Sequence, residues 1–323
     1  MQSSHAKSVS WILVSIGAML VPACTLFHRH VEFSPEPAVG ILKSLGDKVR
    51  RVPAYEVVSP RTNEDEAGRR AEEVLSIFRG RAELPAKHAR NGVGHVYQAG
   101  PLQFEIADAT GAEILVDLDR YTRFEGQLPK GIEEKLPRLA DDYIRRLFPD
   151  VRPEEVHFLG LKKIMDATVK LDRKGEPAGE ISAHVANYIA LYERRLDDIP
   201  VIGPGGKIRI YFSSTGEVIG HAKTWRELRR IPGSEKAVLS PSAVRAAFEK
   251  RHEAEKVAAL RVDRLYFGYF AEGRYTRQQV LRPVYVIGYV TGPAAKRTFE
   301  MYDAVTGEDI TPREGDETGA DRR

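Results

Sequence analysis

The amino-acid sequence predicts an α+β fold made of repeated units, each with one helix packed on an antiparallel β-sheet. Three segments carry apolar residues at the spacing of an amphipathic helix, and strand-like alternation follows each of them. A Thr-Gly turn recurs after each helix, which indicates an internal repeat. A helix that covers one face of a sheet forms the two-layer architecture expected of such a unit.

The N-terminus of the 323-residue chain resembles the signal of a bacterial lipoprotein. Residues 9–21 form a charge-free stretch after Lys7. Its length suits the hydrophobic region of a signal peptide and is below the roughly 20 residues that span a membrane. Ala23 then precedes Cys24, the only cysteine. We expect Cys24 to be the lipid attachment site, which would anchor the chain in a membrane.

Two other interpretations of this leader stay open. The charge-free stretch extends over residues 8–27, so an uncleaved signal-anchor helix is one alternative. A cleaved signal with a chance cysteine is the other. All three place the body outside the cytoplasmic membrane, and we expect an extracytoplasmic, membrane-anchored lipoprotein.

The three helices have recognisable starts and ends. Asn63 and Glu66 form a capping box before the first. Residues 132–147 hold the spacing of the second, which ends before Pro149. The third begins at Ser240 with a proline in its first turn.

Glycines mark the turns of the repeat. Residues 104–114 and 299–310 match at Phe-Glu, Asp-Ala, Thr-Gly and a final Ile, with one insertion. We expect Gly111, Gly216 and Gly307 to be structural turn residues, because tight strand reversals need the positive φ that glycine adopts readily.

This pattern resembles the PepSY domain, in which helix and strands are followed by Asp-Ala-x-Thr-Gly-Glu. The best match is 284–290 with 299–310, and the stretch 199–208 with Trp225 and Arg226 is similar to the YycH/YycI group of envelope regulators. The resemblance implies a non-enzymatic role outside the membrane, in binding and inhibiting proteases or regulating a membrane partner. It implies no catalytic residues.

With this resemblance the expected order of domains is a signal peptide (1–23), a lipidated tether (24–61), three PepSY-like units (62–126, 127–235 and 236–311) and a disordered tail (312–323).

Motifs for catalysis and metal binding are missing from the sequence. One cysteine excludes internal disulfides and Cys-rich metal sites, and no His-Glu-x-x-His or Gly-x-Ser-x-Gly motif occurs. Asp117 and Asp119 begin like a calcium loop that Tyr121 and Thr122 do not continue. We therefore predict no metal, no cofactor and no catalytic residues.

Aromatic residues supply the candidate interface. Tyr266 to Phe270 hold four large aromatic side chains, so this strand is either buried on both faces or exposes one row for binding. Trp and Arg are enriched at interfaces. The candidate interface residues are Trp225, Arg226, Tyr266 and Tyr269.

The sequence thus favours a lipid-anchored, non-enzymatic binding protein that regulates or inhibits an envelope protein, such as a protease or a sensor. A formal net charge of +3 gives no reason to expect nucleic acid. An envelope enzyme with dispersed catalytic residues and a carrier of a small or lipidic ligand remain alternatives.

We predict that Cys24→Ser releases the protein from the membrane fraction of cells, because the acyl chains have no other attachment point. Fractionation and immunoblotting of the full-length chain measure this. Unchanged membrane retention would favour the signal-anchor interpretation.

Overall fold

The computed structural model describes residues 50–58, 62–78, 85–121, 126, 129–168, 182–255, 260–291 and 296–312. The predicted signal peptide, Cys24 and nearly all of the predicted tail lie outside these residues. None of the helices in the described ranges is long and apolar enough to span a membrane.

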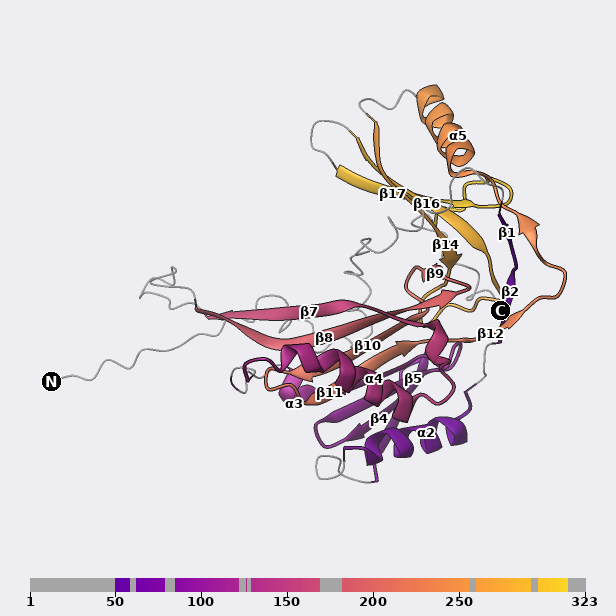
Figure 1. The fold of residues 1–323 in the computed structure, drawn as a ribbon. Helices are drawn as coiled ribbons and strands as arrows, with labels where there is room; N and C mark the ends of the chain where they lie inside the picture. Colours follow the sequence, from indigo (N-terminus) through magenta and orange to yellow (C-terminus); the bar gives the residue numbers. More distant parts are fainter. Residues whose placement is uncertain are drawn as a thin grey trace. The chain divides into compact units, whose positions relative to one another are not determined.

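Four α-helices and seventeen strands occur in the described part of the chain (Figure 1). The helices are α2 (Glu64–Ser76), α3 (Leu118–Tyr121), α4 (Leu136–Leu147) and α5 (Pro241–Ala254). The strands are β1 (Arg51–Val52), β2 (Tyr55–Val58), β3 (Lys87–Arg90), β4 (Gly94–Ala99), β5 (Leu102–Ala107), β6 (Glu113–Asp117), β7 (Val156–Thr168), β8 (Ser182–Leu196), β9 (Ile199–Ile202), β10 (Lys207–Ser213), β11 (Val218–Thr224), β12 (Glu227–Arg230), β13 (Lys236–Ala237), β14 (Arg261–Phe270), β15 (Val280–Leu281), β16 (Pro283–Thr291) and β17 (Lys296–Asp303).

The local signals for the helices are confirmed. Glu66 donates its backbone N–H to the Asn63 side chain at 2.9 Å, and the Glu66 carboxylate accepts from the Asn63 backbone, so the capping box is complete. Ser240 caps α5 by accepting from the Ala243 backbone at 3.1 Å.

The predicted fold class is wrong. The strands do not form repeated helix-on-sheet units; twelve of them form one mixed sheet in the order β17-β16-β14-β9-β8-β10-β11-β6-β5-β4-β3, with β7 also paired to β8. The last strand of the first predicted unit, β6, pairs with β11 from the second predicted unit. Likewise β9 pairs in parallel with β14 from the third. A separate unit would expose an edge strand with unpaired backbone groups, and pairing between units satisfies those groups.

Part of the predicted tether is also strand. β2 pairs with β12 and with β15, and β1 pairs with β13. The alternation of Tyr55 and Val57 inward with Glu56 outward suits a half-buried strand, and this short signal outweighs the prolines around it.

The described chain divides into two compact units. Unit 1 comprises the described parts of 60–192 and 207–225, and unit 2 those of 33–59, 193–206 and 226–323.

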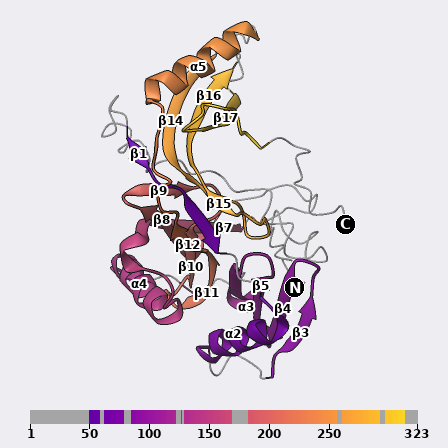
Figure 2. The same cartoon turned by 90° about the vertical axis from the view of Figure 1, so that its right-hand side faces the viewer.

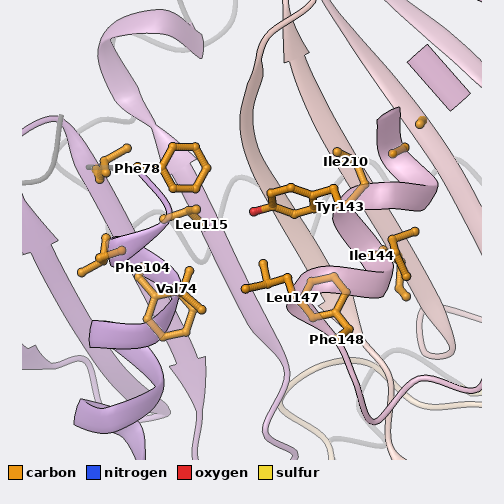
Figure 3. Close-up of a cluster of buried hydrophobic side chains, with 14 of the residues drawn as sticks. Val74, Phe78, Phe104, Leu115, Tyr143, Ile144, Leu147, Phe148 and Ile210 are labelled. Carbon is orange, nitrogen blue, oxygen red and sulfur yellow. The ribbon is translucent and has the colours of Figure 1, made fainter. Parts of the chain in front are cut away.

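The core of unit 1 lies between one face of its strands and the helices α2 and α4. In Figure 3 Val74 of α2 and Phe78, two residues after that helix, lie near Phe104 and Leu115. Tyr143 and Leu147 of α4 lie on the side of Ile210, and all of these residues belong to one buried cluster. The strand residues of this cluster include Phe104, Leu115 and Ile210, all fully buried.

Unit 2 has its own core beneath α5, which packs against β16 (Figure 2). Phe248 of α5 is fully buried there with Tyr269 and Ile287 from the strands.

Two leucines of α4 test this division between core and surface. We predict that Leu147→Ala, which empties a site that is 1% exposed, destabilises unit 1 by about 2–5 kcal/mol. Leu139→Ala on the same helix, at a site that is 43% exposed, should cost less than about 1 kcal/mol. Urea denaturation followed by tryptophan fluorescence compares them. Equal losses would contradict the assignment of the two faces.

Candidate functional site

A buried carboxylate organises the centre of unit 1. Glu113 of β6 is 2% exposed and accepts two hydrogen bonds from Arg70 of α2, at 2.8 Å from Nε and 2.7 Å from Nη2. Arg70 also donates to the Leu147 backbone carbonyl at 3.1 Å. This guanidinium therefore joins α2, β6 and the end of α4.

A second cation lies beside Glu113. Lys223 of β11 is its direct cross-strand partner, with Nζ 4.0 Å from Oε1, and Lys223 also donates to Asp150 at 2.8 Å. Burial alone acts to raise the pKa of Glu113. The hydrogen bonds from Arg70 and the charge of Lys223 outweigh it and hold that pKa below its ordinary value.

His221 and Tyr143 extend this cluster. His221, two residues before Lys223, is fully buried; its Nδ1 lies 2.9 Å from the Tyr143 hydroxyl and its Nε2 3.9 Å from Glu113 Oε1. Burial lowers the pKa of His221 to about 4, and the nearby positive charges of Arg70 and Lys223 act in the same direction. His221 is therefore neutral at pH 7.

The row from Tyr143 through His221 to Glu113 resembles a catalytic relay in composition only. Burial and the negative charge of Glu113 raise the pKa of Tyr143, so its hydroxyl stays protonated and is not activated as a nucleophile. The row holds α4 against the strands.

A groove lies beside this cluster on unit 1. Its volume is about 540 Å³. The lining residues come from the two positions after α2, from one face of α4, and from the turn before β11 with the first residue of that strand. They are Ile77, Phe78, Leu139, Asp142, Tyr143, Arg146, Gly216, Glu217 and Val218. The Tyr143 side chain thus lines the groove while its hydroxyl contacts His221.

The charged groups of the groove are not equivalent. The Asp142 carboxylate pairs with Arg145, and the Glu217 carboxylate pairs with Arg120. Arg146 is exposed and has no ion-pair partner within the described residues. The guanidinium of Arg146 is therefore the charged group of the groove that is available to pair with a ligand.

The four candidate interface residues are buried. Trp225 is 7% exposed and belongs to the core of unit 1, while Tyr269 is fully buried in unit 2. Tyr266 is 5% exposed and lies in a different cluster from Tyr269, so the aromatic strand β14 is buried on both faces. None of the four supplies an exposed contact surface.

Arg226 instead holds a loop of unit 2 in place. Its guanidinium donates to the Gln278 side chain at 3.0 Å and to the backbone carbonyls of Glu272 at 3.2 Å and Thr276 at 2.8 Å. The side chain satisfies the backbone of residues 272–276, which is a structural role.

The three turn glycines all have positive φ: 65° at Gly111, 87° at Gly216 and 76° at Gly307. Each donates its backbone N–H back across its turn, to Ala107, Ser213 and Asp303 respectively. Gly216 also lines the groove.

Sequence reasoning missed both the cluster and the groove. The signal for Glu113 was available in β6, where it shares the inward face with Leu115. A glutamate at an apolar position predicts a buried cation partner, but nothing in the sequence identifies that partner as Arg70. Among the described residues, no three His, Cys, Asp or Glu side chains are grouped to hold a metal ion.

Comparisons with known proteins place few limits on this site. No family model and no curated protein matches the chain. An uncharacterized protein from Eubacterium rectale is a structural neighbour with 13% identity and a TM-score of 0.49, covering 82% of this chain and 87% of its own. The C-terminal domain of Bacillus megaterium YpeB is another, with 13% identity and a TM-score of 0.35, covering 78% and 96% respectively. No functional conclusion follows from likenesses at this level.

The lowered pKa of His221 has a consequence for stability. The histidine of the unfolded chain takes up a proton near pH 6.5, whereas folded His221 stays neutral down to about pH 4. Stability therefore falls as the pH is lowered through this window. We predict that His221→Gln makes the free energy of unfolding less dependent on pH in this window, reducing its slope by up to about 1.4 kcal/mol per pH unit.

Urea denaturation at half-unit steps between pH 4 and pH 7 measures the slope. His157→Gln, at an exposed histidine of β7, is the matched control and should keep the wild-type slope. A wild-type slope in His221→Gln would contradict the buried neutral state.

Proposed function

We propose that this chain is a non-enzymatic binding protein whose groove on unit 1 receives a segment of a partner protein in the cell envelope. The observation that supports this proposal is the groove itself, which has a volume of about 540 Å³ and a lining of apolar residues together with three charged ones. Leu139 contributes to that lining while 43% exposed, although the helix has fully buried apolar positions on its other turns. An exposed leucine in a hollow gains free energy when a ligand covers it.

The polar groups of the groove suit recognition better than proton transfer. Asp142 and Glu217 are each held by an arginine, and the Tyr143 hydroxyl is engaged with His221. A general base needs a free lone pair aimed at the substrate, whereas paired carboxylates form a charged rim of the kind that surrounds an apolar interface centre.

The envelope location in this proposal rests on the leader. A lipid on Cys24 would keep the body at the membrane surface, and a partner there, such as a protease or sensor, would be regulated or inhibited by occupancy of the groove. A carrier of a small or lipidic ligand is the second candidate, because the groove volume also lies in the range of small-molecule sites.

Site-specific cross-linking tests the proposal. A photoreactive amino acid is placed at Leu139 in the full-length chain in its own cells, and at Arg138 as the matched control. Arg138 is exposed on the same helix and does not line the groove. We predict a discrete protein adduct from position 139 that is absent from position 138, with the contact peptide identified by mass spectrometry.

The groove also has a variant that tests binding without disturbing the core. Leu139→Glu should leave unit 1 folded, because the site is half-exposed, and should abolish the adduct formed by a cross-linker at the neighbouring lining position Val218. Equal adducts from positions 138 and 139, or a 218 adduct that survives Leu139→Glu, would overturn the groove as the binding site.

A further inference from the structure

We infer that Arg146 recognises a carboxylate of the partner, so that the segment bound in the groove is an acidic peptide with apolar side chains next to its acid. This inference rests on the proposed function and specifies the chemistry of its partner.

The geometry of α4 places Arg146 and the apolar lining together. Leu139, Tyr143 and Arg146 are separated by four and three residues, so they lie along one face of the helix over about two turns. An apolar side chain covering Leu139 would therefore lie about two helical turns, or 10 Å, from the Arg146 backbone. That distance corresponds to a few residues of peptide, and the long arginine side chain shortens it.

The charges around Arg146 leave it available. The two acids that line the groove are neutralised by Arg145 and Arg120, neither of which lines it. Arg146 lies in the last turn of α4, where its charge interacts favourably with the helix dipole. That interaction does not use the planar set of guanidinium donors, which fits a carboxylate with two parallel hydrogen bonds.

The same charges favour a peptide over an acyl chain. The lining combines apolar residues with Asp142, Arg146 and Glu217, so the complementary ligand carries both apolar and polar groups. A peptide has both in its side chains and backbone amides. An acyl chain would desolvate the polar groups at its sides without replacing their hydrogen bonds.

Selection from a displayed library of random heptapeptides tests the inference on the purified full-length protein. We expect the wild type to enrich peptides that combine apolar residues with Asp or Glu. Arg146→Glu should lose the acidic preference and enrich Lys or Arg in its place. Arg138→Glu, an equal charge change on the same helix outside the groove, should select the same peptides as the wild type.

Affinity measurements then quantify the contact. The most enriched acidic peptide is synthesised together with its amide analogue, in which Asn or Gln replaces the acid. We expect Arg146→Glu to reduce the affinity for the acidic peptide by at least about tenfold. The amide analogue should bind the wild type and the variant with the same affinity. Arg146→Lys should keep part of the affinity, because it retains the charge but loses the paired donors.

The outcomes separate this inference from the proposed function. Apolar peptides without charge preference, lost on Leu139→Glu and unaffected by Arg146→Glu, would overturn carboxylate recognition and leave the groove as the binding site. No enrichment, or enrichment unaffected by Leu139→Glu, would overturn the proposed function as well. Competition by oleate but by no library peptide would favour the carrier alternative.

Discussion

The buried carboxylate of Glu113 is the constraint on which unit 1 depends. An ionised group without partners in an apolar core is disfavoured by several kcal/mol, so its surroundings must supply cations and donors. Arg70 meets this need from α2 and Lys223 from the neighbouring strand, and Arg70 also contacts the last turn of α4. One charge thus determines where two helices and two strands meet. Apolar residues of the same volume can be equally stable at such a site, whereas removing one partner alone leaves an uncompensated buried charge.

This buried cluster also fixes part of the wall of the groove. Tyr143 forms part of the groove wall, and its hydroxyl is held by His221, so the ring has a fixed position before any ligand arrives. Side chains that are already ordered lose little conformational entropy on binding. The buried polar groups thus fix the position of one side chain in the adjoining groove wall.

The parts of the fold that could be predicted are those encoded by neighbouring residues. The caps at Asn63 and Ser240 and the spacing over 132–147 identify the three long helices, because their hydrogen bonds form within four residues. The pairing of strands is not determined by neighbouring residues in this way. Whether β6 pairs with β11 depends on contacts between residues about a hundred positions apart.

The same limit applies to the site. Leu139 and Arg146 belong to a predicted helix, but the groove also needs Phe78 and Val218 from segments far away in the sequence. Arg226 was predicted at an interface because arginine is common there, and its buried donors instead meet backbone carbonyls some fifty residues later.

The pairing of distant strands in unit 2 has one more consequence. β2, at residues 55–58, lies between β12 and β15, so during synthesis its neighbours emerge more than 160 residues after it. The described strands of unit 1 lie between residues 87 and 224, and only the end of β8 belongs to unit 2. Unit 1 can therefore assemble before the partners of β2 have been synthesised. The pairing of β2 with β12 and β15 can form only after these later strands are made, and the larger sequence separation of its strands makes unit 2 the slower of the two to form.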